Sequence, residues 1–299
     1  MAKNTENKAL QLCVVGVNPS SRATFRLDKI ESKYNVIPHK CGMAIFRKSL
    51  AFTLAEVLVV LGIIGVVSAL TLPNLNQNTG NKETVAKLQK VQSELNDALG
   101  RAQAEYGPVK TWVKTESTDN AIRKKFDDRI TEFLKVSKTC AQGVSGCFTN
   151  TTPKNFRGAA TATVWNVYND AQYNRYILAD GTSVMFGFWN KRCGGFNAPD
   201  GSKTGCGYLE VDLDGPNKGP HQAGKDIFLF DISNTYGIYP FGSFQVAYDI
   251  DAIYKRCFNT GETCAAWVIN NGNMDYLKAD ANGKCPNGKV LSQTVTTCK

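Results

Sequence analysis

One acidic residue, Glu56, lies inside a long apolar stretch of the sequence. From Phe52 to Pro73 the chain reads FTLAEVLVVLGIIGVVSALTLP, and Glu56 is the single ionisable side chain of this run. A carboxylate in such surroundings costs at least about 2.5 kcal/mol on membrane-insertion scales, and it is usually retained there for a function. We therefore expect Glu56 to be paired with a cationic group supplied by a partner.

A second group of oxygen-bearing side chains lies on a glycine-rich segment. Its members are Asp212, Asp214, Asn217 and Asp226. Oxygen ligands that alternate along a loop suit a hard cation such as Ca²⁺, although the order departs from the EF-hand pattern of Gly at the sixth place and Glu at the twelfth. Asp and Asn also form turns through their own backbone, so a calcium site and ordinary turn chemistry both remain open.

Histidine is scarce, which limits the catalytic chemistry that the chain can perform. His39 and His221 are its only two histidines, so a three-His metal site is excluded. A Ser-His-Asp triad would depend on His221, which lies in a Gly- and Pro-rich loop with no nucleophile signature nearby, and we expect it to be a structural loop residue. The sequence also has no Gly-rich phosphate loop ending in Lys-Ser or Lys-Thr. We expect that the protein is not an enzyme.

Eight of the ten cysteines lie after residue 139. Within successive pairs of these eight the intervening residues number six, twelve, six and twelve, and no Cys-x-x-Cys pair suggests a zinc ribbon or a thioredoxin motif. Of 105 possible pairings, four sequential disulfides are the simplest prediction. They are Cys140–Cys147, Cys193–Cys206, Cys257–Cys264 and Cys285–Cys298. Disulfides indicate an oxidising compartment outside the cytoplasm.

The positive charge is concentrated at the N-terminus. Residues 1–51 carry nine basic and three acidic side chains, so this segment accounts for +6 of the net +9. The remaining chain carries about +3, far below the basic density of a dedicated nucleic-acid module. General nucleic-acid binding is therefore not expected.

The apolar run is long enough to predict a membrane-spanning helix. At a rise of about 1.5 Å per residue, Phe52 to Leu72 would extend roughly 31 Å, the thickness of a bilayer's hydrocarbon core. Arg47 and Lys48 precede the run, so the positive-inside rule places the N-terminus in the cytoplasm and the chain after Pro73 outside it.

A second, amphipathic helix is predicted over residues 81–106, because apolar residues recur there at spacings of three and four. These residues are Val85, Leu88, Val91, Leu95, Leu99 and Ala102. Gly107-Pro108 should end the helix. Pro73 should kink the connection between the two helical halves, and two separate helices with a short linker are the alternative.

The remaining residues, 108–299, predict an α+β head with an antiparallel sheet. We expect a further helix over residues 120–136, and a hairpin whose strands, 176–179 and 183–189, flank the turn at Asp180-Gly181. Residues 208–213, 227–232 and 265–269 are further predicted strands.

The segment from Lys48 to Glu56 resembles the N-terminal processing motif of the type IV pilin and pseudopilin family. It combines a basic leader end, a small residue, Phe with Thr-Leu-x-Glu after it, the apolar helix and the distal Pro73. The resemblance implies cleavage by a prepilin peptidase between Ala51 and Phe52, and methylation of the new amino group of Phe52. Ala51 departs from the family's usual Gly, which predicts less efficient processing.

The resemblance also implies a fold and a set of partners. A pilin-like long N-terminal helix, with a transmembrane half (52–73) and an amphipathic half (74–107), would pack on an antiparallel head (108–299) that carries disulfides. Glu56 would pair with the Phe52 ammonium of a neighbouring subunit during filament assembly. The expected partners are other pilin or pseudopilin subunits, the prepilin peptidase and an inner-membrane assembly platform. The 212–226 loop is also similar to the acidic calcium loop of major pseudopilins.

The leader of residues 1–51 is longer than processing needs. The nine residues from Met43 to Ala51 would supply the basic end and the cleavage site by themselves, so we expect translation to start at Met43. Residues 1–42 are then upstream sequence without a fold.

Two functions follow from these features. The first is a structural subunit of a type IV pilus or a type II secretion pseudopilus. A head of about 190 residues is large for a repeating shaft subunit, which favours a minor or tip subunit. The alternative is a membrane-anchored adhesin or glycan-binding protein that acts outside a filament. It would use exposed aromatic residues, for which the candidates are Trp165, Tyr168, Tyr173 and Tyr176, and their other interpretation is core packing.

Overall fold

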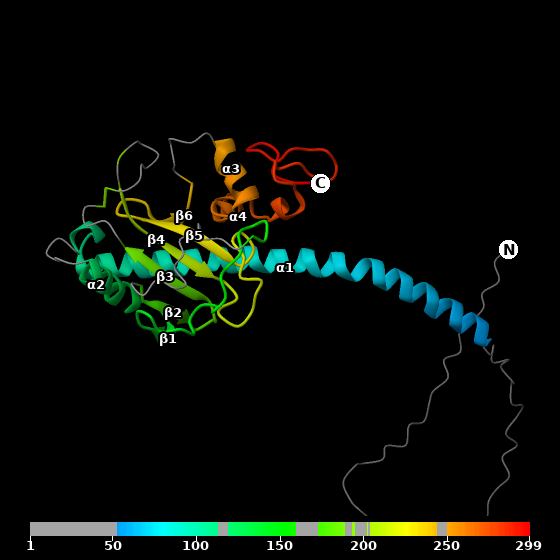
Figure 1. Ribbon diagram of the computed structural model, residues 1–299, viewed down its shortest axis with the longest axis horizontal. Coiled ribbons are helices and arrows are strands. Elements are labelled where there is room, and N and C mark those ends of the chain that lie inside the picture. The colour runs from blue at the N-terminus through cyan, green and yellow to red at the C-terminus, as the bar shows by residue number, and fades with distance from the viewer. Residues whose placement is uncertain are drawn as a thin grey trace, which may run out of the picture. The chain divides into compact units, whose positions relative to one another are not determined.

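The computed structural model describes residues 53–112, 119–159, 173–188, 193–194, 202, 204–243 and 250–299 (Figure 1). Helix α1 (Leu54–Tyr106) is one element of 53 residues that continues through position 73. The alternative of two separate helices is therefore wrong. The helix ends before Gly107, which has a φ of +78°, and Pro108, as the sequence predicts.

Six strands among the described residues form one antiparallel sheet in sequential order from β1 to β6. They are β1 (Val136–Cys140), β2 (Arg175–Leu178), β3 (Ser183–Phe188), β4 (Gly205–Asp212), β5 (Ile227–Ser233) and β6 (Gly237–Pro240). The helices are α2 (Asp119–Thr131), α3 (Ile250–Asn259) and α4 (Cys264–Asn271), and short 3₁₀ turns form at Val109–Thr111 and Asp275–Lys278. The predicted α+β class with an antiparallel sheet is confirmed.

The core lies between one face of this sheet and the apolar stripe of α1. All six stripe residues predicted from the sequence, from Val85 to Ala102, are buried, and so is Ala98 between them. From the sheet, Phe186, Leu209 and Phe230 belong to the same hydrophobic cluster. The stripe is visible in the sequence because α1 buries only one side in the head.

The edge strand β6 is fastened to α1 mainly by the side chain of Asn96, and Gln92 Nε2 adds a 3.4 Å hydrogen bond to the carbonyl of Ile238. Asn96 Nδ2 donates to the carbonyl of Ile238 at 2.7 Å, and the Ile238 N–H donates to Asn96 Oδ1 at 2.8 Å. A single amide thereby satisfies both backbone groups of an edge residue, which would otherwise lack a strand partner.

Three sequence predictions of secondary structure need correction. The predicted strand at 265–269 is wrong, because these residues form α4. The helix predicted over 120–136 ends at Thr131, where Phe133 N and Leu134 N donate to carbonyls three residues back and the chain turns into β1. The hairpin exists, but its connection is a four-residue loop closed by Leu178 N donating to Thr182 O, with a positive φ at Gly181 rather than at both turn residues.

The four disulfides are those predicted from the spacing. Their sulfur atoms lie 2.00 to 2.11 Å apart in the pairs Cys140–Cys147, Cys193–Cys206, Cys257–Cys264 and Cys285–Cys298. Cys257–Cys264 joins the end of α3 to the start of α4, and so braces the helical C-terminal part of the head.

Within the described ranges, no helix has both the length and the apolar character needed to cross a membrane. The predicted cleavage site at Ala51 and Phe52, the leader and the proposed start at Met43 lie outside the described residues.

Candidate functional site

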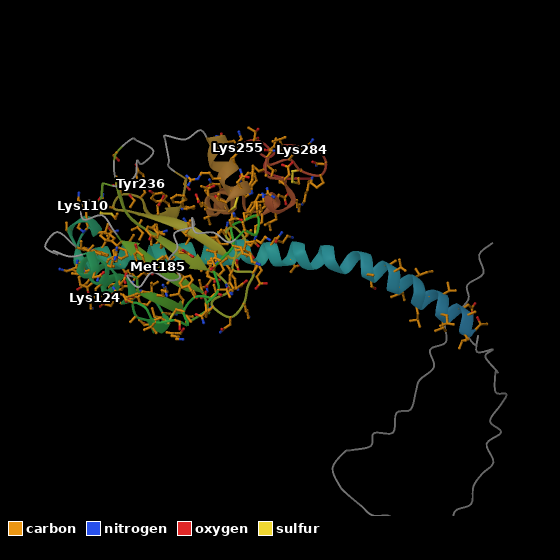
Figure 2. All side chains as sticks on the ribbon, in the orientation of Figure 1. Lys110, Lys124, Met185, Tyr236, Lys255 and Lys284 are labelled. Carbon is orange, nitrogen blue, oxygen red and sulfur yellow. A yellow bond between two sulfur atoms is a disulfide. The ribbon has the colours of Figure 1, made fainter. Side chains whose placement is uncertain are left out.

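The N-terminal part of α1 presents large apolar side chains on all sides. Figure 2 shows side chains projecting all around this part of the helix, which is coloured blue. The exposed fractions of these residues run from 46% at Val57 to 81% at Leu54. The set consists of Leu54, Val57, Leu58, Val59, Val60, Leu61, Ile63, Ile64, Val66 and Val67. A helix that is apolar on every side needs an apolar environment around it, unlike the one-sided second half of α1.

Glu56 belongs to this apolar part, in the first turn of α1. An acidic side chain is favourable at a helix N-terminus, because it faces the positive end of the helix dipole. Gly62 and Gly65 lie further along, and a Cβ added at either would meet no atom within 4 Å. Because glycine has no side chain, another helix can approach α1 closely at these two positions.

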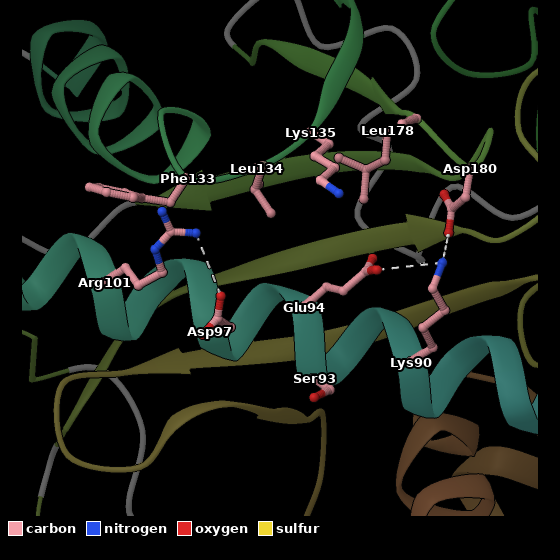
Figure 3. A pocket seen from close by; sticks show the side chains of 11 residues that line it. Lys90, Ser93, Glu94, Asp97, Arg101, Phe133, Leu134, Lys135, Leu178 and Asp180 are labelled. Carbon is pink, nitrogen blue, oxygen red and sulfur yellow. Dashed lines mark hydrogen bonds and ion pairs between the residues drawn. The ribbon is translucent and has the colours of Figure 1, made fainter.

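A groove of about 660 Å³ runs between the second half of α1 and the β1–β2 edge of the head (Figure 3). Five of its six charged side chains form ion pairs, and the sixth is Lys135. Lys90 Nζ lies 2.9 Å from Asp180 Oδ2 and 3.4 Å from Glu94 Oε1, and the hydrogen bond to Asp180 is the largest cause of the raised pKa of Lys90. Arg101 Nη1 lies 3.8 Å from Asp97 Oδ2, and its guanidinium stacks 4.9 Å from the centroid of the Phe133 ring.

One of these ion pairs connects the helix to the sheet, and the other two lie within α1. Lys90 belongs to α1 and Asp180 to the β2–β3 loop, so their ion pair ties two separate elements together. Both partners of each pair are partly exposed, and exposed ion pairs contribute about 1 kcal/mol or less. Because exposed charges are screened by salt, we expect the small stabilisation from these ion pairs to fall as the ionic strength rises.

A buried cluster forms where β4 ends and the loop before β5 returns. It consists of Asp212, His221 and Asp226, each of which offers one ligand atom within 4.8 Å of the others. His221 Nδ1 lies 3.1 Å from Asp212 Oδ2. The backbone N–H groups of His221 and Gln222 donate to the two carboxylate oxygens of Asp226 at 2.6 and 2.7 Å. The His221 backbone has a φ of +50°, which is uncommon for a residue other than glycine.

The two carboxyl groups of this cluster are strongly perturbed. Burial, followed by the negative charge of Asp226, raises the pKa of Asp212 to about 8. Burial also raises the pKa of Asp226, against the opposing effect of its hydrogen bonds from Gln222 and His221. The site therefore holds closely spaced acids that favour either a proton or a cation beside them.

The structure brings together two of the four residues predicted to bind calcium. Asp212 and Asp226 meet in the cluster, whereas the side chain of Asp214 pairs with Lys87 Nζ at 3.3 Å. Asn217 lines a separate hollow of about 270 Å³ that also includes Lys87 and Asp214. His221 was missed as a candidate ligand. Its position five residues before Asp226 in the same loop was the available signal.

The aromatic residues proposed for glycan binding do not form an exposed platform where they are described. Tyr173 and Tyr176 are buried, with exposed fractions of 8% and 5%. The Tyr176 hydroxyl donates to the buried carboxylate of Asp127 at 3.2 Å. Trp165 and Tyr168 lie outside the described residues.

Comparison of the chain with protein-family models, with curated proteins and with solved structures finds no match.

Proposed function

We propose that this protein is a subunit of an extracytoplasmic filament of the type IV pilin or pseudopilin kind. The observation that carries the proposal is the division of α1. Its second half buries one apolar stripe in the head, whereas the large apolar side chains from Leu54 to Val67 are exposed all round. Each such side chain gains about 1.5 to 3 kcal/mol when it is fully buried, so this half requires an apolar partner.

The proposed partner changes during assembly. The apolar half is first held in the cytoplasmic membrane with the head outside, and it then moves into a bundle of the same helices at the filament core. Four disulfides in the head support an oxidising, extracytoplasmic location. The open surfaces at Gly62 and Gly65 support close packing of neighbouring helices.

Processing precedes assembly in this proposal. A prepilin peptidase hydrolyses the bond between Ala51 and Phe52, and the new amino group of Phe52 is methylated. The ammonium of one Phe52 then pairs with the carboxylate of Glu56 on the next subunit, which sets the stagger between them. Other pilin subunits and the inner-membrane assembly platform are the remaining partners.

The head favours a minor or tip position in the filament. After β6 the chain adds α3, α4 and a disulfide-closed C-terminal segment to a sheet that is already complete. Such additions enlarge a subunit beyond what a closely repeated shaft can accommodate. A membrane-anchored adhesin is the alternative function, and the burial of Tyr173 and Tyr176 weighs against its proposed binding surface.

The test compares Glu56→Gln with Glu83→Gln, which changes an exposed acid on the same helix. If Glu56 pairs with Phe52, Glu56→Gln should insert into the membrane normally and fail to enter sheared filaments, as measured by immunoblotting of both fractions. Glu83→Gln should behave as the unsubstituted protein in both fractions. N-terminal sequencing of filament material should begin at Phe52. Normal incorporation of Glu56→Gln would contradict the pairing role of Glu56, and a mature protein that keeps residue 51 would contradict the processing step.

A further inference from the structure

We propose that Asp212, His221 and Asp226 form a binding site for one zinc-like divalent cation on the head. This inference does not depend on filament assembly, because the cluster lies entirely within the head. Each residue supplies one donor atom, and the three atoms lie within 4.8 Å of one another. In a tetrahedral zinc site the metal–ligand distances of about 2.0 to 2.2 Å place donor atoms about 3.4 Å apart. His221 Nδ1 and Asp212 Oδ2 form a hydrogen bond of 3.1 Å, so these two donor atoms are already close to that spacing.

Strand pairing and backbone hydrogen bonds hold the three residues of the site in place. Asp212 is the last residue of β4, and Asp226 immediately precedes β5, so the sheet register fixes both of them. His221 is held by its own N–H bond to Asp226 Oδ2. Asp212 is fully buried, and the side chain of His221 is 15% exposed, which leaves a path from solvent to the ring.

Further carboxyl groups lie near the cluster. Besides Asp212 and Asp226, the carboxyl groups of Glu210 and Asp214 both raise the pKa of Asp212 by their charge. Lys87 neutralises Asp214 at 3.3 Å from outside the cluster. A divalent cation between Asp212 and Asp226 would neutralise both carboxylates in a position where burial makes their repulsion costly.

A fourth polar group, outside the cluster, lies on the neighbouring strand beside Asp212. Ser183 is fully buried, and its Oγ has no hydrogen-bond partner in the described part of the protein. In the β3–β4 register Ser183 lies directly opposite Asp212, so their side chains occupy the same face of the sheet. A buried hydroxyl without a partner is costly, and a cation or its bound water would satisfy it.

The donor set distinguishes this site from a calcium loop. Ca²⁺ takes six to eight oxygen ligands, whereas one imidazole with two carboxylates suits zinc and its neighbours among the divalent metals. Of the two remaining oxygen residues of the predicted calcium set, Asp214 is engaged with Lys87 and Asn217 lines another hollow. Bound metal would clamp the segment between β4 and β5, which holds the exposed residues 217–220.

The test uses the full chain in detergent, with its disulfides intact and with Cys13 and Cys41 alkylated. Zinc chloride and, separately, calcium chloride are titrated calorimetrically into the unsubstituted protein, His221→Asn and Asp226→Asn. Asn is chosen at 221 because it tolerates the positive φ. Asp280→Asn is the matched control, since Asp280 also accepts two backbone N–H bonds in a turn, from Asn282 and Lys284.

We expect one zinc ion per chain, an affinity at least about tenfold lower in both site variants, and an unchanged affinity in Asp280→Asn. Calcium should not compete. The chain has only two histidines, so ¹H–¹⁵N spectra of the unsubstituted protein give a readout that needs no stable variant. Zinc should shift the ring signals of His221 and leave those of His39 in place. Absence of stoichiometric zinc binding, equal affinity in all variants, displacement by calcium, or a shift confined to His39 would overturn the inference.

Discussion

Replacing Asp127 with asparagine should make the head more stable in alkaline buffer. Asp127 lies on α2 and is buried, with an exposed fraction of 1%. Its Oδ2 accepts hydrogen bonds from Asn174 Nδ2 at 2.9 Å and from the Tyr176 hydroxyl at 3.2 Å, which fasten α2 to the sheet. Its Oδ1 has no hydrogen-bond partner within the described residues. Burial raises its pKa from 3.8 to about 7, despite the two hydrogen bonds.

The sign of the pH effect follows from proton binding. Between pH 3.8 and about 7 the folded protein keeps the proton on Asp127 and the unfolded chain has lost it, so stability falls as the pH rises through this window. Below pH 3.8 and above about pH 7, the contribution of Asp127 to the free energy of unfolding no longer changes with pH. At about 1.4 kcal/mol per pKa unit, the whole shift corresponds to about 4 kcal/mol, and about 3 kcal/mol of that is lost between pH 5 and pH 8.

An asparagine side chain at this position would keep an oxygen acceptor for Asn174 and Tyr176 and would carry no charge at any of these pH values. We therefore expect Asp127→Asn to be close to the unsubstituted protein in stability at pH 5, and to exceed it by up to about 3 kcal/mol at pH 8. Urea denaturation of the full chain in detergent at both pH values measures this difference. The control is Asp128→Asn, which changes the exposed neighbour that pairs with Lys124. An equal loss of stability from pH 5 to pH 8 in Asp127→Asn and in the unsubstituted protein would refute the reasoning.

Two further substitutions test how the sheet is held. Asn96→Ala should lower the free energy of unfolding by about 1 to 3 kcal/mol, because it leaves the N–H of Ile238 without its partner and leaves the Ile238 carbonyl only the 3.4 Å hydrogen bond from Gln92 Nε2, and hydrogen exchange at Ile238 should accelerate in the same variant. Gly187→Ala should cost about 1 to 3 kcal/mol in urea denaturation, since its Cβ would lie 2.4 Å from the Tyr208 ring on the neighbouring strand, whereas Gly62→Ala, with nothing within 4 Å, should not destabilise the head.

The disulfides and the stripe of α1 could be predicted because each depends on local spacing. Two cysteines separated by six or twelve residues can meet across one short loop. The observed disulfides all join successive cysteines in this way. The stripe from Val85 to Ala102 has helical period because only one side of α1 contacts the sheet. The cluster at Asp212 could be predicted only in part, since the approach of His221 depends on how the loop before β5 folds back over the end of β4.

Helix α4 shows why some elements cannot be identified from periodicity. Every residue from Cys264 to Val268 is buried, so the sequence has neither the alternation of a half-exposed strand nor the stripe of a half-exposed helix. A short apolar run of this kind is equally consistent with a buried strand. The environment decides between them: the Cys257–Cys264 disulfide holds the start of the segment against the end of α3, where a new strand would have no ladder to join. Gly272, with a φ of +62°, then donates its N–H to Val268 O and ends the turn as a left-handed cap. Both constraints involve residues outside the apolar run, Cys257 and Gly272, so the run alone could not reveal them.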